Sequence, residues 1–81
     1  MSYLARNEKQ IGNIIRRIRK KKGFSQAAIG EKCGLRQGTI SVLESGNPAI
    51  KMKTFLSVLA ALDLELKIQP REKGLDIEDL F

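Results

Sequence analysis

The sequence predicts an all-α domain, a bundle of four or five helices, followed by one β-strand and a short acidic tail. Three observations indicate this fold class. Apolar residues recur at helical spacing in four successive segments up to residue 62, and turn-forming residues separate these segments. From residue 64 to residue 69 the pattern changes to apolar–polar alternation, which is typical of a half-buried strand. The 81 residues, 42% of them hydrophobic, suffice for one domain with one modest core.

The first helix is expected to begin at Glu8 and to stop at Gly23. Its apolar face is formed by four isoleucines at positions i, i+3, i+4 and i+7, namely Ile11, Ile14, Ile15 and Ile18. Basic residues fill most of the remaining positions: Arg16, Arg17, Arg19, Lys20, Lys21 and Lys22. Positive charge in the last turn suits the negative end of the helix dipole.

Ser25 is expected to cap a second helix, Gln26–Cys33, because serine can accept a hydrogen bond from a free amide of the first turn. Gly34 ends this helix, and Leu35 is an apolar plug in the short connection. A third helix is expected over residues 36–44.

The turn-rich residues 45–48 then separate the third helix from a fourth, expected at residues 51–62. The inward-facing side chains of the second, third and fourth helices are expected to be Ile29, Cys33, Ile40, Leu43, Phe55, Val58, Leu59 and Leu62.

The alternating segment contains the dimer residues that the sequence predicts, Leu64, Leu66 and Ile68, and Pro70 closes it. No other segment of the chain has a strand pattern, so the backbone groups of this strand need a partner elsewhere. We expect the same strand of a second copy, antiparallel across a two-fold axis. The alternative is a frayed end of the fourth helix.

Residues 1–69 are therefore assigned to one domain that holds the helices and the dimerisation strand, and residues 70–81 to a flexible acidic tail. The tail mixes carboxylates with four spaced apolar residues, Leu75, Ile77, Leu80 and Phe81. This composition suits a segment that docks on a partner protein. The alternative is a disordered tail that only increases solubility.

Charge is distributed unevenly along the chain, whose net charge is +6. Residues 1–69 hold 13 of the 15 basic residues and 5 of the 9 acidic ones. A basic body indicates a polyanion such as nucleic acid as partner, and the alternative is a basic surface that is merely solvated. Because no apolar run approaches a membrane span and Met1 is not followed by a signal-peptide core, we expect a cytoplasmic, nucleoid-associated protein.

Enzymatic activity is not expected. The chain has no histidine, no phosphate-binding glycine loop and no nucleophile motif, and its acidic residues are scattered. A single cysteine, Cys33, cannot form an intrachain disulfide or a usual zinc site, so we interpret it as a small core residue and expect no metal and no cofactor.

Two short helices joined by a turn that contains glycine have the geometry of a helix-turn-helix. The evidence is the spacing of four residues. Gly30 is expected to allow a close helix crossing, Gly34 to make the turn, Leu35 to plug it, and Ile40 to anchor the third helix.

The segment SQAAIGEKCGLRQGTISVLESG, residues 25–46, resembles the helix-turn-helix of the phage-repressor and Cro-type (XRE) family, which implies a lambda-repressor-like fold. The matching residues are Ser25, Gln26, Gly34, Ile40, Ser41, Glu44 and Gly46. Two residues depart from the family pattern. Gly30 replaces the usual alanine at a cost of about 1 kcal/mol in helix propensity, and Arg36 replaces a small capping residue.

The segment LDLELKIQP after the fourth helix, with a tail that ends in an aromatic residue, is similar to HipB-type antitoxins. The resemblance implies a homodimeric repressor that binds double-stranded operator DNA of its own operon and holds a HipA-like serine/threonine kinase toxin. In that group the strand after the helices pairs across the dimer. The alternatives are a stand-alone phage-type or metabolic repressor without a toxin, and a protein-interaction module that inherited the fold.

In a helix-turn-helix the N-terminal part of the second helix faces the base edges. The expected groove contacts are Arg36, Gln37, Gly38, Thr39 and Ser41. The expected contacts to the DNA backbone are Ser25, Gln26, Arg17, Lys21, Ser45, Asn47, Lys51 and Lys53. The family resemblance further implies a structural ion pair between Arg19 and Glu44.

Overall fold

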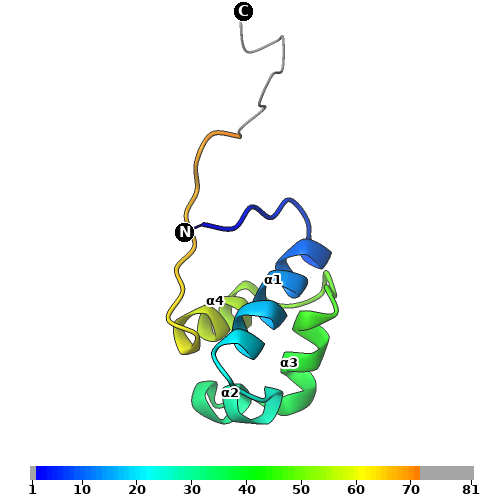
Figure 1. Cartoon of the computed structure of the whole chain (residues 1–81). Coiled ribbons are helices and arrows are strands. Elements are labelled where there is room, and N and C mark those ends of the chain that lie inside the picture. Colours follow the sequence, from blue (N-terminus) through cyan, green and yellow to red (C-terminus); the bar gives the residue numbers. More distant parts are fainter. Residues whose placement is uncertain (1, 72–81) are drawn as a thin grey trace, which may run out of the picture.

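The computed structural model describes residues 2–71 and contains four α-helices within them (Figure 1). These are α1 (Glu8–Lys21), α2 (Gln26–Cys33), α3 (Gln37–Glu44) and α4 (Met52–Ala61). The predicted all-α bundle is confirmed with four helices, and each helix lies within two residues of its expected bounds. The tail residues Leu75, Ile77, Leu80 and Phe81 lie outside the described residues.

Side-chain caps set two of the helix starts. The hydroxyl of Ser25 accepts a hydrogen bond from the amide of Ala28 at 3.0 Å, which confirms the predicted cap of α2. Asn7 caps α1 in the same way by accepting from the amide of Gln10, a cap that the sequence analysis missed. Arg36 is the N-cap residue of α3 but makes no capping hydrogen bond with its side chain.

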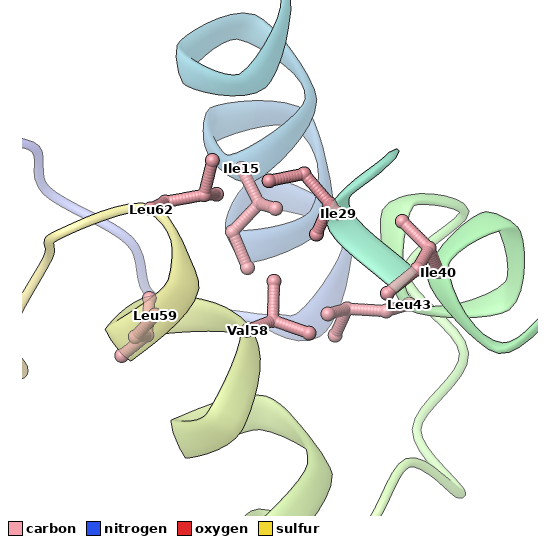
Figure 2. Close-up of a cluster of buried hydrophobic side chains, with 7 residues drawn as sticks. All are labelled: Ile15, Ile29, Ile40, Leu43, Val58, Leu59 and Leu62. Carbon is pink, nitrogen blue, oxygen red and sulfur yellow. The ribbon is translucent and has the colours of Figure 1, made fainter. Parts of the chain in front are cut away.

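The core lies where the four helices converge (Figure 2). Seven buried side chains form it: Ile15, Ile29, Ile40, Leu43, Val58, Leu59 and Leu62. Four side chains that were expected inside are only half-buried, namely Ile11, Ile14, Cys33 and Phe55. Ile11, Cys33 and Phe55 pack on the rim of the core, whereas Ile14 lies at the margin of the apolar face of α1, about 100° around the helix from Ile15.

Two glycines allow backbones to approach closely. A Cβ atom on Gly12 of α1 would lie 2.5 Å from the carbonyl oxygen of Glu44, at the end of α3. A Cβ atom on Gly30 would lie 2.6 Å from the carbonyl oxygen of Leu35. Gly30 was expected at a crossing of α2 and α3, and its nearest neighbours are the backbone of the turn, at Leu35 and Arg36, and of the first residue of α3, Gln37.

The chain leaves the bundle after α4 and continues as an extended segment (Figure 1). Asp63 has a φ of 59°, so the helical path of α4 ends before it, and residues 64–71 are neither helix nor strand. Leu64 packs against the core, whereas Leu66 is 50% exposed and Ile68 is 90% exposed. Within residues 2–71 this single chain has no strand, and the expected pairing with a second copy stays a prediction.

The close contact at Gly12 gives a stability prediction. Because an added methyl group would meet the backbone of α3, Gly12→Ala should lower the free energy of unfolding by about 1–3 kcal/mol. Gly38→Ala is the matched control, since a Cβ there has no protein atom within 4 Å and the helix propensity improves. Urea denaturation of both variants checks this, and equal stability of the two would contradict the packing role of Gly12.

Candidate nucleic-acid interface

The helix-turn-helix consists of α2, a short turn and α3. Gly34 ends α2 with a φ of 72°, in the left-handed region that favours glycine. The amide of Leu35 donates to the carbonyl of Gly30 at 2.7 Å, and the Leu35 side chain packs against the core. Ile40 is fully buried on the inner side of α3. The turn and this anchor together fix the direction of α3.

The N-terminal half of α3 presents the predicted groove residues to solvent. Arg36, Gln37, Gly38 and Ser41 are exposed, and Thr39 is half-buried. No atom beyond the local helix backbone lies within 4 Å of a Cβ at Gly38, so nothing in the fold requires a glycine there. The absent side chain leaves the backbone of α3 open to a close approach from outside.

Arg19 and Glu44 form a buried, bidentate ion pair between α1 and α3. Arg19 Nε lies 2.5 Å from Glu44 Oε2, and Arg19 Nη2 lies 3.0 Å from Glu44 Oε1. The two side chains are only 7% and 3% exposed. Arg19 also donates from Nη1 to the carbonyl of Phe24 at 2.8 Å, which ties the end of α1 to the same network.

Gln26 joins this network at the first residue of α2. Its Nε2 donates to Glu44 Oε1 at 3.1 Å, a contact that the sequence analysis missed because it assigned Gln26 only to the DNA backbone. In the sequence, this contact was indicated only by the places of the two residues: a glutamine begins α2 and a glutamate ends α3. Glu44 therefore connects three helices.

The charge state of Glu44 follows from its surroundings. Burial acts to raise the pKa of its carboxyl group, but hydrogen bonds from Arg19 and Gln26, with the charges of Arg19 and Arg16, outweigh burial and hold the pKa below its ordinary value. The hydrogen bonds that Arg19 donates to Glu44 are the main reason that the pKa of Arg19 is raised. Both groups are charged at neutral pH, so the pair adds no net charge beside α3.

Several predicted backbone-contact side chains already bond within the chain. Ser25 caps α2, the Ser45 hydroxyl donates to the carbonyl of Val42 at 2.6 Å, and Asn47 Oδ1 accepts from the amide of Ala49 at 2.8 Å. The predicted cations are all exposed: Arg17, Lys21, Lys51 and Lys53. The first two lie on α1 and the second two at the start of α4.

Cys33 has the environment of a packing residue. Burial raises the pKa of its thiol, and the sulfur donates to the carbonyl of Ser57 at 3.6 Å. Within residues 2–71, no group of three or more histidine, cysteine, aspartate or glutamate side chains could hold a metal ion. No helix in the same range is long and apolar enough to cross a membrane.

The depressed pKa of Glu44 gives a pH prediction. Its ionised form stabilises the fold, so this contribution is fully present above the ordinary pKa of 4.5 and is lost as the pH falls through the lower folded-state pKa. Glu44→Gln leaves Arg19 buried without its counter-charge and should lower the free energy of unfolding at pH 7 by about 3 kcal/mol. In urea denaturation at several pH values, the difference from the wild type should shrink below pH 4.5; a constant difference would refute the linkage.

Comparisons with known proteins agree with this geometry. The sequence model of the helix-turn-helix family matches residues 15–68. The antitoxin HipB of Escherichia coli strain K12 is 29% identical over 59 residues, which are 73% of this chain and 67% of the relative. HipB of Escherichia coli strain CFT073 has the same identity over the same length, and the match covers 63% of it. The chain therefore spans roughly two thirds of the length of these relatives.

Solved HipB structures share the fold over nearly the whole described chain. A HipA-HipB-O2-O3 complex superposes with a TM-score of 0.82 at 24% identity and covers 88% of this chain and 100% of that chain. A HipB-O1-O2 complex superposes with a TM-score of 0.80 at 25% identity, and the match covers 85% of this chain and 100% of that chain. The chain therefore belongs to the helix-turn-helix family of the phage-repressor and Cro (XRE) type and is HipB-like within it.

Proposed function

We propose that this chain is a sequence-specific transcriptional repressor and the antitoxin of a type II toxin–antitoxin system. It binds the operator of its own operon and neutralises a HipA-like serine/threonine kinase. The observation that carries the DNA-binding part is the exposed N-terminal half of α3, held on a rigid frame by the turn and by Glu44. The similar HipB structures, which are complexes with HipA and with O1, O2 and O3, support the two partners.

The exposed residues of α3 have distinct roles in this proposal. Gln37 can form two hydrogen bonds to adenine N6 and N7, and Arg36 can do the same to guanine O6 and N7 or bind a phosphate. Thr39 and Ser41 contact a thymine methyl group or a nearby phosphate. Gly38 lets the backbone come close to the groove floor. The backbone contacts predicted at Ser25, Gln26, Ser45, Asn47, Lys51 and Lys53 position the protein without selecting sequence.

The repressor is a homodimer in this proposal, and the extended segment after α4 forms its strand. Leu66 and Ile68 expose apolar surface, and no other part of residues 2–71 pairs with their backbone. An antiparallel strand pair across a two-fold axis covers this apolar surface and also pairs the backbone groups of the segment. The same axis places two copies of α3 on half-sites that are one or more helical turns apart, so the operator is an inverted repeat.

A second candidate function is a stand-alone repressor without a toxin. It uses the same α3 surface and the same dimer, and it differs only in the tail. The neighbouring gene separates the two, because an antitoxin of this kind is encoded beside a kinase-like protein.

Base specificity tests the role of Gln37. Gln37→Ala should reduce discrimination by about 1–3 kcal/mol at one base pair in each half-site, because a bidentate contact to a base is lost. The measurement is fluorescence anisotropy on the duplex that the wild-type chain selects from a random library, with every base pair substituted in turn. A uniform loss over all sequences would instead make Gln37 a phosphate contact.

Sedimentation equilibrium tests the dimer strand. Leu66→Pro removes a backbone amide from a segment that carries no helix, so the variant should become monomeric and keep the helical content of the wild type. Leu66→Val is the matched control, since valine favours strands and should leave the dimer intact. A dimeric Leu66→Pro variant would overturn the pairing.

Toxin binding tests the tail. Removing residues 75–81 should weaken binding of the neighbouring kinase and leave operator affinity unchanged, because the apolar and acidic side chains of the tail lie outside the helix-turn-helix. Isothermal titration calorimetry with the full-length and shortened chains measures both. Equal kinase affinity would remove the tail from the proposal, and no kinase binding by the full chain would favour the stand-alone repressor.

A further inference from the structure

The basic side chains of α1 are not equivalent, because one side of this helix is fixed against α3. Arg19 is buried against Glu44, and a Cβ on Gly12 would touch the end of α3. Successive residues of an α-helix are 100° apart. Arg16 and Lys20 therefore lie about 60° and 100° from Arg19. Arg17 and Lys21, two residues either side of Arg19, both lie about 160° away, on the side remote from α3.

The side of α3 that faces Arg19 also carries two of the exposed groove residues. By the same helical geometry, Gln37 lies about 20° from Glu44 around α3 and Ser41 about 60°. Thr39 lies about 140° away and is half-buried. Gln37 and Ser41 therefore lie on the same side of α3 as Glu44, whose side chain binds Arg19.

Two observations tie this side of α3 to the neighbouring helices. Gln26 at the start of α2 donates to Glu44, so α2 borders the same side. Arg16 lies three residues before Arg19 on α1, about 60° around the helix from it, and its charge contributes to the low pKa of Glu44. Arg16 and Lys20 are both exposed, and they stand one turn apart, about 6 Å along the axis of α1.

We propose that Arg16 and Lys20 form a second DNA-backbone contact segment, which extends the α3 surface onto α1 and binds phosphates next to the base pairs that α3 contacts. Arg17 and Lys21, which the sequence alone had assigned to the DNA backbone in place of Arg16 and Lys20, lie on the side of α1 remote from α3 and stay in solvent, so this inference replaces that assignment. This inference rests on the proposed operator binding. The ligand class is the phosphodiester backbone of duplex DNA, and the contacts add affinity without sequence preference.

The experiment compares two charge-matched double variants, Arg16→Gln with Lys20→Gln, and Arg17→Gln with Lys21→Gln. Each removes two positive charges from α1, so the long-range field changes equally and only the position differs. Affinity for the duplex selected by the wild-type chain is measured over a series of salt concentrations. Each phosphate contact contributes about 0.9 to the slope of log affinity against log salt.

The variant at positions 16 and 20 should lower the magnitude of this slope by about 2 for each bound chain and weaken binding to all sequences alike. The variant at positions 17 and 21 should keep the wild-type slope. Arg16→Lys with Lys20→Arg should restore the slope, which separates lost charge from lost folding. Equal slopes for the two glutamine variants, or a loss confined to positions 17 and 21, would overturn this inference, whereas no salt-dependent binding by the wild type would overturn the proposed function.

Discussion

The buried carboxylate of Glu44 joins three of the helices described here. It accepts hydrogen bonds from Arg19 of α1 and Gln26 of α2 while it ends α3. A buried carboxylate without partners would be strongly unfavourable, so the three helices meet in one relative arrangement that satisfies it. The apolar core supplies most of the stability of the bundle. The contacts of Glu44 with Arg19 and Gln26 fix the orientation of α3 relative to α1 and α2.

The junction depends on close backbone contact, and glycine permits it. At Gly12 a single methyl group would push α1 away from the end of α3 and lengthen the Arg19–Glu44 contact. At Gly30 the same change would meet the carbonyl of Leu35, which lies in the turn before α3. Both residues cost helix propensity, and both lie where the position of α3 is determined. Gly38 also lowers helix propensity, but no atom beyond the local helix backbone lies within 4 Å of a Cβ there. The missing side chain therefore matters only for a molecule that approaches α3 from outside.

An acidic residue beside a DNA-facing helix would repel phosphate if its charge were uncompensated. The bidentate contact with Arg19 neutralises Glu44, and the charge of Arg16 lies near it. The surface around the end of α3 therefore has a positive balance although it contains a carboxylate. Arg19, which forms the ion pair, and Arg16 and Lys20, the proposed phosphate contacts, lie close together on α1, so in the proposed complex the position of a basic residue on that helix decides its role.

The sequence by itself determined the approximate bounds of the four helices and the side chains at the centre of the core, while it left the total open at four or five helices. Local and periodic signals carry this information: the cap at Ser25, the stop at Gly34 and the isoleucine spacing in α1 each act within a few residues. The family resemblance extended these signals to the groove-facing half of α3. The pairing of Arg19 with Glu44 was available only through that resemblance, because 25 residues separate the two.

Only the tertiary structure decided how the helices face one another. The contact of Gln26 with Glu44 and the close approach at Gly12 depend on helix orientation, which no local pattern encodes. The sequence shows the six basic residues between positions 16 and 22 as one group, and the packing of α1 against α3 divides those on α1 into a side near α3 and a side remote from it. The extended segment after α4 is the opposite case. Its alternation predicts a strand, but residues 2–71 of a single chain contain no strand, because a strand is completed only by a second strand.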